Sequence, residues 1–189
     1  MTEPRVRVRD FEPTNDTAWA EELLESELAG RFQVRRGELV DALEGSGLVG
    51  ELDGRPIGLV TWVVADATAV RGGEAEIRVL VVAPDARWRG AGSVLLGWAR
   101  RALLRAGVER AWLVTTNDNL DALGFYQRRG WRLAELHPGA VDDARRMLKP
   151  EIGQRAANGI PIHDELVLEI DLDAEGRPGA PTSVSGSLG

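Results

Sequence analysis

The segment from Val79 to Gly92 constrains the fold of this chain more than any other stretch. It begins as a Val-rich apolar run, typical of a buried strand, and is broken by Pro84. Two arginines and two glycines follow and lead into an amphipathic helix. The first turn of a helix has backbone N–H groups without acceptors and carries partial positive charge, which the arginines reinforce. The segment therefore predicts a strand–loop–helix unit that binds a phosphate group.

Length and composition predict one globular domain followed by a short tail. The chain has 189 residues, of which 43% are hydrophobic, enough to bury a core. We expect residues 1–172 to form the domain, and the Gly-, Pro-, Ser- and Thr-rich residues 173–189 to be a disordered tail. No apolar run has the length of a membrane span and no signal peptide is recognisable. The expected location is therefore the cytoplasm, with no membrane partner.

Cysteine and histidine content limits the available chemistry. The chain has no cysteine and only two histidines, His137 and His163. Thiolate nucleophiles, disulfides and Cys- or His-rich metal sites are therefore excluded, and no metal is expected. The formal net charge of −7 argues against a nucleic-acid partner. Among the 23 basic residues only Lys149 is a lysine, a bias typical of a GC-rich bacterial genome.

Hydrophobic periodicity along the chain predicts an α/β (α+β) domain. Expected strands cover residues 6–9, 48–52, 57–64, 74–82, 111–115, 131–136 and 166–172, with turns at Asp53-Gly54 and Arg71-Gly72-Gly73. Expected helices run from a cap at Asn15 or Asp16 to about residue 28, over 37–43, between Gly92 and Gly107, over 119–129 and over 140–148. Residues 138–162 therefore form an insertion between the last two strands.

Three kinds of phosphate-binding loop compete for residues 87–92. A P-loop requires a lysine after its last glycine, whereas Ser93 follows Gly92 here. A dinucleotide-binding loop requires a third glycine where this chain has Leu95, and it opens the first strand-to-helix unit of its domain. A nucleotide-binding protein is therefore the weakest of the alternatives.

The third kind is the acyl-CoA loop of the GNAT N-acetyltransferase superfamily, which the motif Arg87-x-x-Gly90-x-Gly92 resembles. Downstream, the chain also resembles the second motif of that family, in the expected order and spacing. The segment reads Asn119-x-x-Ala122-x-x-Phe125-Tyr126-x-x-x-Gly130-Trp131. The hairpin 48–64 resembles the central strands of the family, and the resemblance covers roughly residues 4–136 and the last strand. It implies the GNAT fold, a central mixed, mostly antiparallel, splayed sheet of about seven strands flanked by about four helices.

The resemblance implies that the chain binds acetyl-CoA. Backbone N–H groups of residues 87–92 would hold the pyrophosphate, and the two glycines would let the backbone approach it without a Cβ in the way. Pantetheine would lie between two diverging strands, paired to the backbone of the first. The implied cofactor-binding residues are Leu80, Val81, Val82, Arg87, Trp88, Arg89, Gly90, Ala91, Gly92, Ser93, Asn119 and Tyr126.

Acetyl transfer to an amine needs a base and an acid. Tyr126, the only tyrosine, matches the position of the family's general acid; the alternative is a core tyrosine. Glu76 resembles the catalytic glutamate of the histone-acetylating branch and is a candidate base. Two alternatives stay open: Glu76 forms only an ion pair with Arg78, or an ordered water acts as the base. The backbone N–H of Val82 is the implied oxyanion donor. Strand alternation predicts that one face carries Glu74, Glu76, Arg78, Leu80 and Val82.

These motifs do not identify the acceptor. The candidate substrate-binding residues are Trp62, Glu76 and His137. Alternatively, Trp62 is a core tryptophan, Glu76 forms an ion pair, and His137 is an inert loop histidine. Asn119 is expected to cap a helix, and in the family this position also reaches the cofactor. The insertion 138–162 either closes over a polar substrate or packs against a second subunit in a homodimer.

The function predicted from these residues is that of an acyl-CoA-dependent N-acetyltransferase. It would transfer acetyl from acetyl-CoA to a primary amine by direct attack within a ternary complex, and the acceptor would be a small-molecule or peptide amine. The alternative is a non-catalytic acyl-CoA-binding sensor or assembly module. Such a module needs the loop 87–92 but neither an acid nor a base.

Overall fold

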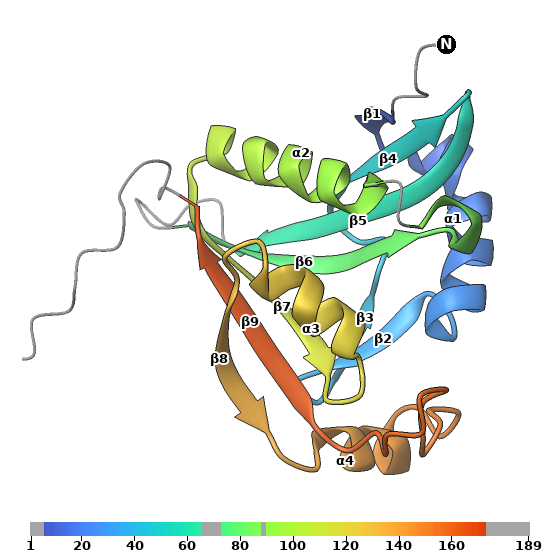
Figure 1. Ribbon diagram of the computed structural model, residues 1–189, viewed down its shortest axis with the longest axis vertical. Helices are drawn as coiled ribbons and strands as arrows, with labels where there is room; N and C mark the ends of the chain where they lie inside the picture. The colour runs from blue at the N-terminus through green and yellow to red at the C-terminus, as the bar shows by residue number, and fades with distance from the viewer. Residues whose placement is uncertain (1–5, 66–72, 88–89, 173–189) are drawn as a thin grey trace, which may run out of the picture.

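The computed structural model describes residues 6–65, 73–87 and 90–172. Seven strands form the main sheet, in the order β1-β4-β5-β6-β7-β9-β8 (Figure 1). They are β1 (Arg7–Asp10), β4 (Ser46–Leu52), β5 (Arg55–Ala65), β6 (Gly73–Val82), β7 (Val108–Thr116), β9 (Glu165–Asp171) and β8 (Arg132–His137). Four α-helices accompany the sheet in the described part of the chain: α1 (Pro13–Leu28), α2 (Ala91–Arg105), α3 (Leu120–Gln127) and α4 (Ala140–Met147). The predicted α+β architecture is confirmed.

The sheet is antiparallel except where β6 runs parallel to β7. These two strands pair only from Gly73 and Val108 up to Glu76 and Trp112, and then they diverge. We call the gap between the remainder of β6 and the remainder of β7 the wedge. The splayed sheet predicted from the family resemblance is therefore present, and its opening begins directly after Glu76.

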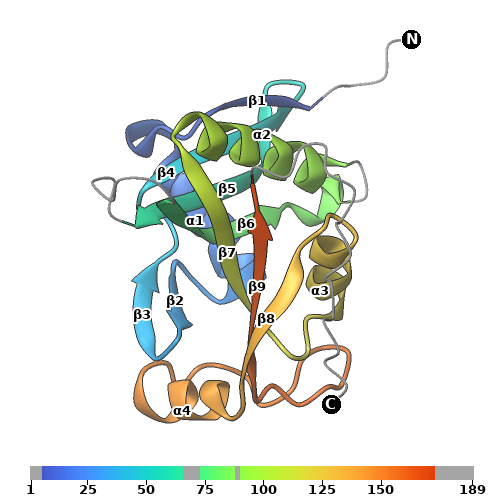
Figure 2. The same ribbon diagram turned by 90° about the vertical axis from the view of Figure 1, so that its left-hand side faces the viewer.

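Two apolar clusters hold helices against opposite faces of the sheet (Figure 2). The α2-side core is the larger, and α3 joins α2 on that face; its buried members include Leu95, Leu103 and Leu168. The α1-side core packs Leu23 and Leu24 of α1 against the other face. No helix within the described residues is long and apolar enough to cross a membrane.

Several turns form as the sequence predicts. Asp53 and Gly54 both have positive φ, 52° and 76°, as a two-residue type I′ hairpin turn requires. Asn119 caps α3, since its side-chain oxygen accepts a hydrogen bond from the backbone N–H of Ala122. Gly107, just beyond α2, also has a positive φ, of 77°.

The helix predicted over residues 37–43 is wrong. This segment belongs instead to a separate hairpin of β2 (Phe32–Arg35) and β3 (Glu38–Asp41), paired from Phe32–Asp41 to Arg35–Glu38. Arg36 and Gly37 form its turn with φ values of 52° and 80°. Because positive φ at two successive residues favours a hairpin, the Arg-Gly pair stops a helix at the position where one was expected to start.

The predicted start of the first helix is also wrong. Helix α1 begins with Pro13 after an N-cap at Glu12, rather than at Asn15 or Asp16. The Asp16 carboxylate accepts a hydrogen bond from the backbone N–H of Glu12 and binds both terminal nitrogens of Arg9. Asp16 thus ties α1 to the first strand from inside the helix.

The predicted face of β6 changes because the strand has a bulge. Ile77 pairs with Trp62 and Val79 pairs with Thr61, which leaves Arg78 without a partner in the register. Ala75 and Ile77 lie in the α2-side core, and beyond the bulge Leu80 and Val82 pack against the same core. Glu74 and Glu76 therefore face the opposite side from Leu80 and Val82, contrary to simple alternation.

Some sequence predictions fall outside the described residues. These are the turn at Arg71-Gly72, the cofactor contacts of Trp88 and Arg89, and the tail 173–189. Gly73 itself begins β6. The insertion 138–162 contains α4, and the turn expected at its end is present, with Gly159 at a φ of 83°.

Candidate functional site

The loop that precedes α2 has the geometry expected of an anion-binding helix terminus. Pro84–Ala86 form a 3₁₀ turn directly after β6. Gly90 is the N-cap of α2 with a φ of 78°, and no side chain of a described residue caps the helix. A residue with a Cβ is strained at that φ, so glycine allows the chain to enter the helix at this angle. The uncapped first turn of α2 leaves its N–H groups available to an anion.

Arg87, predicted to add charge to this loop, lies against α1 instead of over the helix terminus. Its guanidinium is paired with the carboxylate of Glu27, and its Nε donates to the carbonyl of Val82 at 3.3 Å. Its side chain remains 47% exposed. The Glu27 side chain is only 13% exposed, so a move of Arg87 to a phosphate would take the counter-charge from a largely buried carboxylate.

Helices α2 and α3 approach each other beside this loop. A Cβ on Gly92 would lie 3.5 Å from the ring of Phe125 and 3.7 Å from Val82. Arg129 joins the two helices, with its guanidinium 3.6 Å from the centroid of the Phe125 ring and hydrogen-bonded to the hydroxyl of Ser93. The sequence predictions missed Arg129, although it stands in the second motif, one residue before Gly130.

A cavity of about 300 Å³ opens under the body of α2. Its lining includes Ser93, Leu96, Arg100, Arg129 and Trp131. Among the predicted cofactor residues that the structure describes, only Ser93 belongs to it. This cavity therefore adjoins the helix terminus but does not include the glycines of the loop.

The backbone of β6 presents free N–H groups to the wedge. The N–H of Ala83 donates to the carbonyl of Ile57 on β5. Since successive N–H groups along a strand point to opposite edges, those of Val82 and Leu80 point away from β5 and into the wedge. A ligand lying in the wedge would find these two donors along its length.

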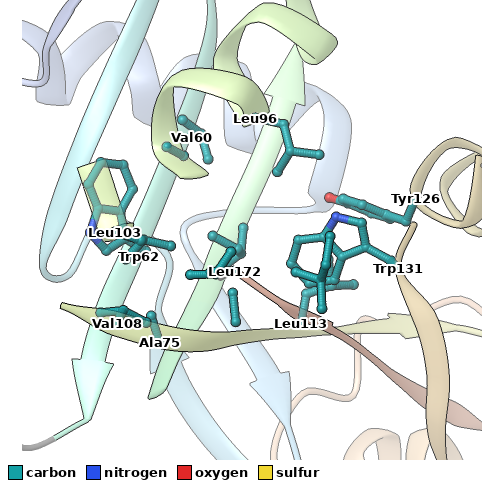
Figure 3. Close-up of a cluster of buried hydrophobic side chains, with 14 of the residues drawn as sticks. Val60, Trp62, Ala75, Leu96, Leu103, Val108, Leu113, Tyr126, Trp131 and Leu172 are labelled. Atoms are coloured by element: carbon teal, nitrogen blue, oxygen red, sulfur yellow. The ribbon is translucent and has the colours of Figure 1, made fainter. Parts of the chain in front are cut away.

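Tyr126 reaches the sheet from α3 and is buried beside two aromatic rings. Its ring lies edge-on to Phe125 and Trp131, with centroid distances of 5.2 and 5.5 Å. Figure 3 shows its hydroxyl pointing inward, towards the core. Burial raises the pKa of Tyr126 to about 12, and the nearby Arg35 acts in the opposite direction. The hydroxyl is therefore protonated throughout the neutral range.

Glu76 lies at the apex of the wedge, on the face opposite Tyr126. Its side chain is 8% exposed, its Oε2 is 2.8 Å from Arg78 and its Oε1 is 3.9 Å from Nε of Arg35. Burial raises the pKa of Glu76, while the two arginines oppose that rise. The ion pair with Arg78, weighed as an alternative to catalysis, is thus present, and it does not exclude a role as a base.

The other candidate substrate residues lie apart from one another. Trp62 is 7% exposed in the α2-side core, at the far end of the cluster from Tyr126 (Figure 3), and so on the face opposite Glu76. His137 ends β8, with its Nε2 2.9 Å from the Glu135 carboxylate. The Glu135 carboxylate is also 3.5 Å from the guanidinium of Arg36, in the turn of the β2–β3 hairpin. His137 therefore lies beside that hairpin.

Arg35 is a site residue that the sequence predictions missed. It lies on β2, and its guanidinium enters the wedge, where it donates to the carbonyl of Arg78 on β6 and, at 3.2 Å, to that of Val114 on β7. It was missed because residues 37–43 were expected to be helical, although the Arg36-Gly37 pair was an available signal of a hairpin turn.

The insertion packs against its own chain. Lys149, which follows α4, donates to the carbonyls of Ala29 at 2.8 Å and Phe32 at 2.7 Å, at the end of α1 and the start of β2. Both views show α4 next to the β2–β3 hairpin (Figures 1 and 2). Asn117, at the end of β7, fixes the other end of the insertion by accepting from the N–H groups of His163 and Asp164.

Comparison with known proteins identifies the family. Residues 9–131 match the sequence profile described as Acetyltransferase (GNAT) family. The protein YxbD of Bacillus subtilis (strain 168), described as uncharacterized, is 38% identical over 132 residues, which cover 70% of this chain and 77% of that protein.

Solved structures show the same fold. The IAA acetyltransferase from Bacillus cereus ATCC 14579 superposes with a TM-score of 0.64 at 18% identity, covering 88% of this chain and 99% of that one. Arabidopsis thaliana Naa50, in complex with the bisubstrate analogue CoA-Ac-MVNAL, superposes with a TM-score of 0.65 at 15% identity, covering 88% and 98%. From the profile match, the similarity to YxbD and the splayed sheet, we conclude that this chain belongs to the acetyltransferase (GNAT) family.

Proposed function

We propose that this protein is an acyl-CoA-dependent N-acetyltransferase that transfers acetyl from acetyl-CoA to a primary amine. One observation carries the proposal: Tyr126 and Glu76 lie on opposite faces of the sheet, and both are near the Arg35 guanidinium that enters the wedge. A proton donor on one face and a proton acceptor on the other suit a direct transfer between two substrates that meet in the wedge.

The chain offers a continuous binding path for coenzyme A. The uncapped first turn of α2, with Gly90, Ala91, Gly92 and Ser93, would hold the pyrophosphate. The N–H groups of Leu80 and Val82 would pair with the pantetheine in the wedge, beside Val81. Arg87 would turn from Glu27 to a phosphate, and Trp88, Arg89, Asn119 and the newly located Arg129 would complete the site. Bound there, acetyl-CoA supplies the acetyl thioester.

The residues around the wedge would then divide the chemistry. An ammonium acceptor would first lose a proton to water, the neutral amine nitrogen would attack the thioester carbonyl, and the proton that this nitrogen then carries would pass to Glu76, directly or through an ordered water. The N–H of Val82 stabilises the negative charge that develops on the carbonyl oxygen. As the carbon–sulfur bond breaks, the Tyr126 hydroxyl gives its proton to the leaving sulfur.

The acceptor would enter on the side of the β2–β3 hairpin, where Glu76, Glu135, Glu165 and His137 supply groups that can bind a cationic amine. We propose a small-molecule or peptide amine as the acceptor. We also propose that residues 1–172 act as one domain in the bacterial cytoplasm, without a metal or a nucleic acid. A homodimer stays a prediction, because the insertion contacts its own α1 and β2.

The test is turnover. The protein is incubated with acetyl-CoA and a library of amines, amino acids and peptides while free thiol is followed, with a no-amine reaction as the control. We expect at least one amine to release thiol well above that control. CoA binding by calorimetry without turnover of any amine would instead favour a non-catalytic acyl-CoA-binding sensor or assembly module.

A further inference from the structure

Arg35 reaches the centre of the molecule from an element that belongs to neither strand of the wedge. Its side chain is 13% exposed, and it donates one hydrogen bond to β6 and one to β7. The two carbonyls, of Arg78 and Val114, each lie two residues beyond the last residue that pairs the strands. In a continuous parallel pair such carbonyls would bond to the neighbouring strand, so the guanidinium replaces the pairing that the splay removes.

The hairpin that carries Arg35 is fixed at both of its flanks. On one side Lys149 of the insertion donates to the carbonyl of Phe32 at 2.7 Å. On the other side the buried carboxylate of Glu165, on β9, accepts from the backbone N–H of Arg36 at 2.9 Å. The Arg36 guanidinium also lies 5.4 Å from the ring centroid of Trp112, on the same face. These contacts fix the position of β2 relative to the wedge.

Arg35 also faces the candidate base. Its Nε is 3.9 Å from Oε1 of Glu76, and within the described residues neither of these two buried atoms has a hydrogen-bond partner. The charges around Glu76 are Arg35 and Arg36 from the hairpin, Arg78 from β6 and Glu44 from the loop before β4. Tyr126 and Glu165 lie near Arg35 itself. Arg35 is thus the positive group that links both edges of the wedge to Glu76.

We propose that Arg35 is a positioning residue for the transfer reaction: it sets the opening between β6 and β7 and places a positive charge beside Glu76 at the apex. This inference rests on the proposed acetyltransferase function. A planar guanidinium can bridge two carbonyls and still present Nε to a carboxylate, whereas an ammonium group cannot hold that arrangement. The insertion acquires a role as well, since Lys149 anchors the hairpin that delivers Arg35.

The experiment compares Arg35→Met and Arg35→Lys with wild type, using acetyl-CoA and the best amine from the turnover screen. For Arg35→Met we expect kcat to fall by about tenfold or more, because small displacements of reacting groups have effects of this size. The acid limb of its kcat/KM profile should move to higher pH, because a positive charge beside Glu76 is lost. KM for acetyl-CoA should change far less than kcat. Arg35→Lys should keep the acid limb near that of wild type while kcat stays low.

Arg31→Met is the matched control. Arg31 precedes β2 and binds Asp41 and Glu21 away from the wedge, so its loss removes ion pairs without touching the site. We expect wild-type kcat for this variant. If Arg35→Met folds and has kcat and a pH profile within twofold of wild type, the inference is overturned. If Arg35→Met does not fold, a wild-type kcat in Arg35→Lys overturns it equally. A wild type that turns over no amine overturns the proposed function, and this inference fails with it.

Discussion

The surroundings of Tyr126 suit a hydroxyl that must keep its proton until a thiolate leaves. The ring packs against Phe125 and Trp131, and burial raises the pKa of the hydroxyl to about 12. We predict that Tyr126→Phe lowers kcat by about 10²-fold or more, the size typical of a lost acid, because the leaving sulfur loses its proposed proton donor. CoA affinity by calorimetry should change little, since the ring and its packing remain.

The alternative for Tyr126 is a purely structural ring. In that case Tyr126→Phe would show wild-type kcat. Trp131→Phe offers a comparison, because it alters the same aromatic cluster without removing the hydroxyl. A fall in kcat confined to Tyr126→Phe would assign the effect to the proton rather than to packing.

Asp16 gives a pH-dependent prediction about stability. Hydrogen bonds from Arg9 lower the pKa of Asp16 below its unfolded value, so the ionised form stabilises the folded state. This stabilisation is fully present above about pH 4, the unfolded pKa, and it is lost as the pH falls through the lower folded pKa. Asp16→Asn should cost about 2 kcal/mol at pH 7, as expected for hydrogen bonds to a charged group.

Urea unfolding of wild type and Asp16→Asn at pH 7 and at pH 3 measures this effect. The difference between them should shrink at the lower pH. Asp10→Asn serves as the control, because Asp10 is exposed and should change stability by less than about 0.5 kcal/mol. A difference of the same size at both pH values would show that Asp16 acts through packing instead.

At the scale of elements, the sequence predicted what local patterns determine. The strand before Pro84, the helix between Gly92 and Gly107 and the capped helix after Asn119 all form, because each depends on periodicity and on residues close in sequence. The β2–β3 hairpin was missed because residues 37–43 are too few to separate helical from strand periods. The Arg36-Gly37 turn was the decisive signal, and Asp53-Gly54 was recognised on the same grounds.

The candidate site divides in the same way. The glycine loop, Tyr126 and Glu76 could be named from motifs, because their spacing in sequence reflects a local unit. The bulge at Arg78 and the reach of Arg35 could not, because both depend on partners far along the chain. A bulge shifts every later side chain to the other face, so it alone reversed the expected relation between Glu76 and Val82.

The contact of the insertion with α1 and β2 leads to a prediction about stability. Lys149 donates to the carbonyls of Ala29 and Phe32, and burial lowers the pKa of its ammonium group. Lys149→Met keeps the length of the side chain but leaves these carbonyls without their donor, which should cost about 1–3 kcal/mol. Backbone N–H groups of β2 and β3 should also exchange with deuterium faster than in wild type.

Arg146→Met is the comparison for Lys149→Met. Arg146 lies on α4 and its exposed side chain pairs only with Asp143 among the described residues, so its loss should change stability by less than about 0.5 kcal/mol. If the two variants behave alike, the insertion is not anchored through Lys149. In that case its contact with the hairpin contributes little to the placement of Arg35.

For the whole molecule, each face of the sheet carries one part of the proposed reaction. The loop before α2 and Tyr126 of α3 lie with the larger core, while the hairpin, the insertion and Glu76 lie on the face covered by α1. The wedge is the opening in the sheet that connects the two faces. A ligand on one face should therefore stabilise the entire fold, because α2, α3 and both splayed strands surround it.

This arrangement predicts the response to CoA. At a free concentration of 100 times its Kd, CoA should stabilise the folded protein by about 2.7 kcal/mol. For a chain of this size that corresponds to a rise in Tm of about 5–10 °C. ATP and NAD at the same concentration should give a much smaller rise, since the chain lacks the lysine of a P-loop and the third glycine of a dinucleotide loop.

The variant Gly92→Ala tests whether CoA binds at the start of α2. The added methyl makes only ordinary contacts with Phe125 and Val82, and alanine favours a helix over glycine, so the ligand-free Tm should be unchanged or higher. The same methyl would stand in the first turn of α2, which we propose to hold the pyrophosphate, so the rise in Tm with CoA should be largely lost. Differential scanning fluorimetry with and without CoA measures both quantities. A full CoA response in Gly92→Ala would place the cofactor elsewhere, and the cavity under α2 would be the next site to examine.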